Sequence, residues 1–193
     1  MINFVKRKAF SLIFYSTRLT ANNLFSRFAD TLYEIQENSR SSIKKEILIN
    51  YLKDLNPAQI SVAIHLLDIQ NHFRNIKVDF TASKKAIILA LQKLLNLKKS
   101  SMDDLQMKYG DPGLIAKKHL MENNLKLISD HSTNIQEMNL NQLYKYIYEF
   151  HRFSGTDSIE SKKSLMIELF KKCTTLNEMY YLPKVVLVIL NTG

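Results

Sequence analysis

Only four glycines and three prolines occur in the 193 residues of this chain. A protein with many tight turns needs more of both, because turns rely on the positive φ of glycine and the fixed φ of proline. Hydrophobic residues make up 46% of the sequence and recur at helical spacing, as in Leu24, Phe28, Leu32 and Ile35. The sequence therefore predicts an all-α fold: a multi-helix globular domain that is long enough to bury a core.

Several segments carry the residues with which helices begin. Asn56-Pro57 and Asp111-Pro112 each place a capping residue before a proline at the first helical position. Thr175 and Glu178 have the spacing of a capping box. Ser158 is predicted to cap the helix that follows it.

Helical spacing also predicts helices over 82–97 and 101–109, whereas 123–138 is polar and is expected to form a long loop. The run 185–190 is continuously apolar and follows Pro183. We expect a buried helix bent by this proline, with a strand as the alternative.

Three of the four glycines lie in two short segments that precede predicted helices. Gly110 and Gly113 belong to the sequence GDPG, and Gly155 belongs to SGTDS. The first turn of a helix presents unpaired N–H groups and a partial positive charge, which suit a phosphate, and glycine lets the backbone approach it closely. The alternative is that Gly110 and Gly155 simply end helices.

The net charge of +9 is unevenly distributed. Residues 1–29 hold five basic side chains and no acidic one, and 80–102 holds five lysines and no acid. These stretches favour a polyanionic partner, although solvated helix faces would give a similar pattern. Residues 1–23 are interpreted as a basic extension that resembles a mitochondrial targeting peptide, or as a basic helix packed on the domain at 24–193.

Residues typical of catalytic and metal sites are sparse. Cys173 is the only cysteine and is expected in the core, so the sequence predicts no disulfide and no thiolate cluster. The five histidines lack metal-ligand spacing, and no Walker loop or GxSxG motif occurs. No run of 18 apolar residues occurs, so no membrane partner is expected. We predict no catalytic residue, metal or cofactor for this chain.

A faint internal duplication is present. Residues 32–35 (LYEI), followed by a serine, match 147–150 (IYEF), also followed by a serine, and a pair of lysines comes after each. Two pseudo-symmetric helical halves are therefore expected, each offering a helix start and basic residues to one partner.

Three stretches together resemble, in order and spacing, the N-terminal DNA-binding domain of eukaryotic-type ATP-dependent DNA ligases: FADTLYEIQENSR (28–40), GDPGLIA (110–116) and SGTDSIESKKSLMIELFKKC (154–173). The resemblance covers 24–193. It implies an all-α domain of two pseudo-symmetric halves that lies across the minor groove of nicked double-stranded DNA. A separate ligase catalytic core, in cis or in trans, would seal the nick using ATP and Mg²⁺. The resemblance further suggests a monomer in the nucleus, with the mitochondrion as the alternative.

The resemblance also implies which residues touch DNA. Glycines would let backbone N–H groups reach phosphate oxygens, a hydroxyl would add a donor, and basic side chains would neutralise charge without reading sequence. Carried over by position, the residues are Ser39, Arg40, Gly110, Gly113, Gly155, Ser158, Lys162, Lys184 and Gly193.

The chain departs from the family pattern at its C-terminal end. The family has a run of the form R…G-K-L-R-x-G, and here Val188, Ile189 and Asn191 replace glycine, lysine and arginine. The adenylation motif K-x-D-G is absent, so this chain alone is not expected to seal DNA. The alternative function is an all-helical protein-interaction scaffold that has lost DNA binding, with a partner docked near 185–190.

Overall fold

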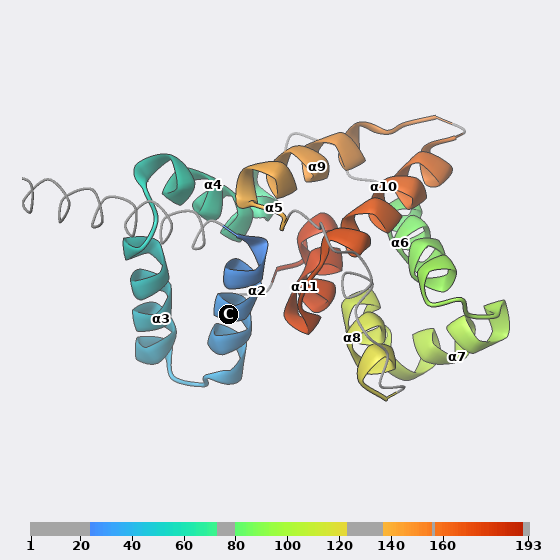
Figure 1. Ribbon diagram of the computed structural model, residues 1–193, viewed down its shortest axis with the longest axis horizontal. Helices are drawn as coiled ribbons and strands as arrows, with labels where there is room; N and C mark the ends of the chain where they lie inside the picture. Colours follow the sequence, from blue (N-terminus) through green and yellow to red (C-terminus); the bar gives the residue numbers. More distant parts are fainter. Residues whose placement is uncertain (1–23, 73–79, 123–136, 156, 191–193) are drawn as a thin grey trace, which may run out of the picture.

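The computed structural model describes residues 24–72, 80–122, 137–155 and 157–190. Over these residues every regular element is an α-helix, which confirms the predicted fold class (Figure 1). The helices are α2 (Phe25–Glu37), α3 (Ser41–Lys53), α4 (Pro57–Leu67), α5 (Ile69–His72), α6 (Phe80–Leu94), α7 (Lys99–Tyr109), α8 (Pro112–Glu122), α9 (Leu140–Arg152), α10 (Ser158–Lys172) and α11 (Leu176–Val186).

The helix starts predicted at Asn56 and Thr175 are confirmed, and each forms a capping box, which was predicted only at Thr175. The Asn56 side chain accepts a hydrogen bond from the backbone N–H of Gln59 at 2.9 Å, and Thr175 Oγ1 accepts one from the N–H of Glu178 at 3.1 Å. A third capping box, in which Asn139 begins α9, was not predicted although its spacing is the same. Each box pairs N–H groups that a helix start otherwise leaves without a partner.

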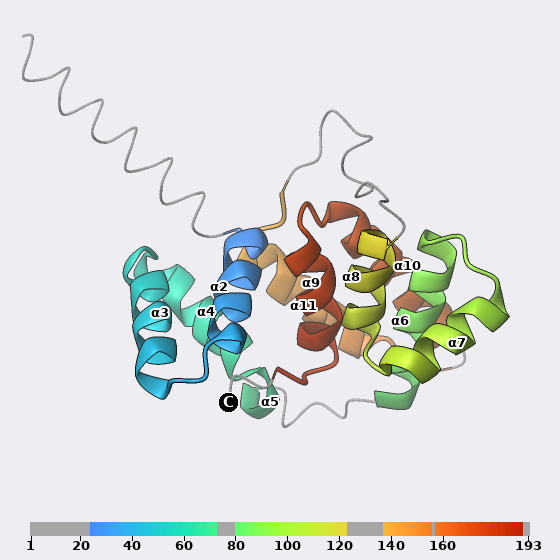
Figure 2. The same cartoon turned by 90° about the horizontal axis from the view of Figure 1, so that it is seen from below.

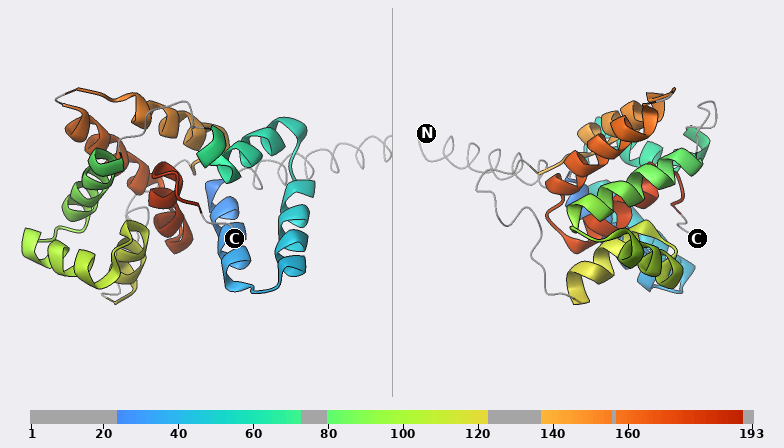
Figure 3. Two further views of the ribbon diagram at one scale, coloured as in Figure 1. Left: turned by 180° about the vertical axis from the view of Figure 1, so that it is seen from behind. Right: turned by 90° about the vertical axis from the view of Figure 1, so that its right-hand side faces the viewer.

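Two groups of helices lie on either side of α11. Helices α2 to α5 form one group, with α9 packed on α4; helices α6, α7, α8 and α10 form the other. Helix α11 contacts both groups, through α2 and α9 on one side and α8 on the other. Figures 1 and 3 show the α2–α3 pair at one end of the long axis and α6 with α7 at the other. The two groups pair their helices differently, and the predicted pseudo-symmetry is not confirmed.

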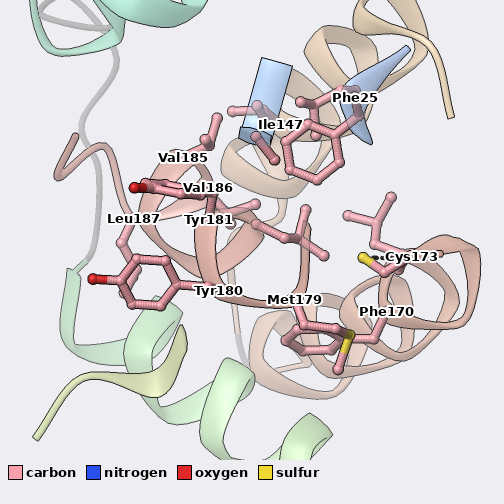
Figure 4. Close-up of a cluster of buried hydrophobic side chains, with 14 of the residues drawn as sticks. Phe25, Ile147, Phe170, Cys173, Met179, Tyr180, Tyr181, Val185, Val186 and Leu187 are labelled. Carbon is pink, nitrogen blue, oxygen red and sulfur yellow. Dashed lines mark hydrogen bonds between the residues drawn. The ribbon is translucent and has the colours of Figure 1, made fainter. Parts of the chain in front are cut away.

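Helix α11 supplies much of the hydrophobic core. Its side chains lie among Phe25 of α2, Ile147 of α9 and Phe170 of α10 (Figure 4). Cys173, which precedes it, is fully buried as predicted. Because α11 packs on both groups, it fixes their relative position.

The C-terminal apolar run is only partly helical. Pro183 lies inside α11, as predicted, but the helix ends at Val186. The backbone then turns, and Val188 has a φ of 59°, a conformation that β-branched residues rarely adopt. The expected helix through residue 190 is therefore wrong beyond Val186, and so is the alternative strand.

The other predicted elements agree with the structure to within a few residues. Helix α6 begins two residues before the predicted 82–97 and ends three residues before its end; α7 covers the predicted 101–109 and begins at Lys99. Most of the long loop predicted over 123–138 lies outside the described residues.

Candidate nucleic-acid interface

The start of α3 is an exposed helix N-terminus. Ser39 and Arg40 lie between α2 and α3, and both side chains are exposed. Arg40 occupies the capping position, and no side chain caps the helix. Lys45, in the first turns of α3, is also exposed. The unpaired N–H groups, the helix dipole and two cationic side chains therefore combine on one solvent-facing segment, which suits an anion.

The GDPG segment has a different environment. Gly110 ends α7 with a φ of 68°, as predicted. Asp111 then caps α8, because its Oδ1 accepts a hydrogen bond from the N–H of Leu114 at 2.9 Å. The protein's own carboxylate thus occupies the start of α8, where an external phosphate was predicted to bind.

Gly113 is buried where α8 crosses α11. A Cβ at this position would lie 2.0 Å from the carbonyl oxygen of Tyr180, so only glycine allows the two helices to pack at this distance. The structure therefore gives Gly113 a packing role and does not present it at the surface.

Lys184 of α11 also lies at the contact between α8 and α11. Its Nζ lies 2.9 Å from Oδ2 of Asp111 and 4.4 Å from the centroid of the Tyr180 ring. Burial, the largest single effect, lowers the pKa of Lys184, but the hydrogen bonds to Asp111 and Tyr180 and their charges together outweigh it and raise the pKa. Lys184 keeps the positive charge, and Asp111 neutralises it inside the protein.

The start of α10 is partly open to solvent. Gly155 is exposed and has a φ of 87°, a conformation that glycine adopts without strain. Ser158, which was predicted to cap the helix, is instead its first residue, and Asp157 occupies the capping position without a capping hydrogen bond from its side chain. The prediction was displaced by one residue because serine and aspartate both favour helix starts.

Lys162 does not reach the surface. Its side chain is 3% exposed, its Nζ lies 3.4 Å from Ser83 Oγ of α6, and it lies 5.4 Å from the ring centroid of Phe150 of α9. A direct contact with phosphate would require this ammonium to leave the core. In this structure Lys162 instead joins the start of α10 to the start of α6. Ser83 lies 79 residues away in the chain, and no local signal identified it as the partner.

His151 lies next to this contact. Its Nε2 is 2.9 Å from the carbonyl oxygen of Val186, so this nitrogen carries the proton and donates it. Burial lowers the pKa of His151 to about 4, with a further lowering from the charge of Lys162. The core around the start of α10 therefore contains a histidine whose neutral form is favoured, near the buried Lys162.

The structure brings some of the predicted residues together and leaves others apart. Gly113 and Lys184 lie at the same contact between α8 and α11, around Asp111, and Gly110 precedes Asp111 in the chain. The loop between α2 and α3, however, lies near one end of the long axis, and the start of α10 lies near the other (Figure 1). Gly193, the remaining predicted contact, lies outside the described residues.

The described residues contain no cluster of histidine, cysteine, aspartate or glutamate that could hold a metal ion. Among the helices that the structure describes, none is long and apolar enough to cross a membrane.

Comparison with known proteins agrees with the resemblance seen in the sequence. A model of the family described as "DNA ligase N terminus" matches residues 24–193. A probable DNA ligase of Persephonella marina is 27% identical over 152 residues, which are 78% of this chain and 25% of that relative. The chain thus spans about a quarter of that relative's length. Because the family model covers nearly the whole chain, this protein belongs to the family of DNA ligase N-terminal domains.

Proposed function

We propose that this chain binds nicked double-stranded DNA across its minor groove, without reading sequence, as the N-terminal domain of an ATP-dependent DNA ligase. The match of the family model over residues 24–193 carries the proposal. The domain holds the duplex, and a ligase catalytic core supplies the nick-sealing chemistry with ATP and Mg²⁺. No residue of this chain reacts in the proposed function.

The solvent-facing helix starts supply the proposed contacts. At the start of α3, the Arg40 guanidinium and free backbone N–H groups hold phosphate oxygens, and Ser39 adds a hydroxyl donor. At the start of α10, the exposed Gly155 lets the backbone approach a second part of the duplex, next to Ser158. In Figure 1 the start of α3 lies at the lower left and the start of α10 at the upper right, so a duplex that contacts both has to cross the molecule obliquely.

Three residues of the sequence prediction have a supporting role in this proposal. Gly113 and Lys184 hold α8 against α11, and Lys162 holds α10 against α6. They keep the helix starts in place without touching DNA.

Fluorescence anisotropy of a labelled nicked duplex tests the function. We expect log Kd to rise linearly with log salt concentration, with a slope of about 0.9 for each phosphate contact, and affinities that agree between duplexes of unrelated sequence. Absence of salt-sensitive binding even at low salt would show that the proposal is wrong.

The alternative function, a protein-interaction scaffold, was predicted to use residues 185–190. These residues are buried except for Ile189, which is 38% exposed. No observation therefore favours a docking surface at this segment.

A further inference from the structure

Helices α6 and α7 form one end of the molecule (Figures 1 and 2), and a second candidate surface lies between them. It is a pocket of about 520 Å³, within the size range of sites that enclose a ligand. Helix α6 contributes residues one turn apart, including Phe80, Lys84 and Ile88, and α7 contributes Lys99 and Met102. We call this surface the α6–α7 pocket.

The α6–α7 pocket has an apolar floor. Ile88 and Met102 are 7% and 1% exposed and form its base, with Leu89 beside them. Phe80 is 50% exposed at the first position of α6 and lines the same pocket. Phe80 and the floor together form an apolar surface that would gain free energy if a partner's apolar side chains covered it.

The rim of the pocket is positively charged. Lys84, Lys85 and Lys99 line it and are exposed, whereas Asp103 is the one acidic residue of the lining. Carboxylates presented around the pocket would therefore be attracted to three ammonium groups. The basic N-terminal segment of this chain has the wrong charge to fill the pocket.

We propose that the α6–α7 pocket binds an acidic amphipathic helix of a partner protein. Apolar side chains spaced three and four residues apart enter the floor, and the flanking carboxylates pair with the lysines. A nucleic-acid backbone matches the rim but not the floor, because phosphates bury no apolar surface. The proposal does not depend on DNA binding.

A designed peptide tests the proposal. The probe is a labelled amphipathic peptide of about 15 residues, the length of α6, with leucines on one helical face and glutamates elsewhere. The control peptide has the same composition in scrambled order, which removes the apolar stripe but keeps the charge. We expect the patterned peptide to bind with at least about tenfold higher affinity than the scrambled one.

Substitutions inside and outside the α6–α7 pocket test whether the peptide binds there. Phe80→Ser is expected to weaken the patterned peptide about tenfold, whereas Met107→Ser, at a side chain that is 87% exposed but outside the pocket, leaves it unchanged. K84E/K85E is expected to weaken it further, and Lys118→Glu on α8 serves as the charge control. Thermal melts show whether each variant is folded.

Two results would overturn the proposal. One is equal binding of the patterned and scrambled peptides, or no saturable binding of either. The other is displacement of the peptide by duplex DNA together with an equal loss of DNA and peptide affinity in Phe80→Ser, which would make the pocket a nucleic-acid surface.

Discussion

The starts of α3 and α8 were both predicted to contact DNA phosphates. In the structure the start of α3 is exposed and uncapped, whereas the start of α8 is capped by the protein itself. At α8, Asp111 occupies the helix start, Lys184 neutralises its other oxygen, and Gly113 packs against α11. At α3, no side chain caps the helix, and Arg40 is exposed beside it. A helix start is available to an outside phosphate only where the chain has not supplied its own acceptor.

The largest expected effect is on stability, at the start of α8, where Gly113 packs against α11. Gly113→Ala should destabilise the protein by about 3 kcal/mol, because the new Cβ would overlap the carbonyl oxygen of Tyr180 and force α8 away from α11. Gly110→Ala is the matched control. Its Cβ would meet no atom within 4 Å, so only the positive φ is strained, at a cost of about 1 kcal/mol.

Urea unfolding of the two variants gives both values. If Gly113→Ala is as stable as Gly110→Ala, Gly113 does not pack tightly against Tyr180, and the start of α8 is accessible to solvent.

The sequence was sufficient for features that depend on neighbouring residues. The helix starts at Asn56 and Thr175, both predicted, depend on residues at most three positions apart, so the signal is visible in a short segment. The helix end at Gly110 is equally local. These local signals, with the apolar spacing, fixed most of the helices.

The environment of the predicted DNA contacts depends on distant residues. Gly113 meets Tyr180, and Lys162 meets Ser83 and Phe150, which are far from it in the chain. A lysine on a helix is usually solvated, so its burial cannot be read from its own segment. The sequence does not show that Arg40 is exposed and Lys162 is buried, because this difference depends on the helices that pack around each residue.

The stability of the protein should depend on pH through His151, which is buried near the start of α10. The pKa of His151 is lowered to about 4, so the unfolded chain binds more protons than the folded one between that value and the ordinary 6.5. Its contribution to the free energy of unfolding is complete above pH 6.5 and is lost as the pH falls, by about 3 kcal/mol at pH 4.

Unfolding free energies measured from pH 7 to pH 4 for the wild type and His151→Gln check this. The difference between the two profiles isolates His151 from other titrating groups, and parallel profiles would contradict the assignment.

Arg40 is exposed and Lys162 is buried, so removal of each basic side chain should affect DNA binding differently. Arg40→Ala should weaken binding to nicked DNA roughly three- to tenfold and reduce the salt slope by about 0.9, because one phosphate contact is lost. Lys162→Met keeps the length of the buried side chain and should leave the slope unchanged, with stability equal or higher, because a buried charge is removed.

Anisotropy titrations at several salt concentrations separate the two roles. A reduced slope in Lys162→Met would mean that this lysine leaves the core to meet phosphate, and it would remove the distinction drawn between the two helix starts.

The smallest expected effect lies at the end of α11, the helix that packs against the start of α8. Val188 holds a positive φ of 59° at a position where the family pattern has glycine. Val188→Gly should therefore change stability by less than about 1 kcal/mol, since relief of backbone strain offsets the loss of a buried side chain. Val186→Gly, at a fully buried helical position, has no such compensation and should cost about 3 kcal/mol. If both variants lose the same stability in urea, the backbone at Val188 is not strained, and the chain has replaced the glycine of the family pattern without a conformational cost.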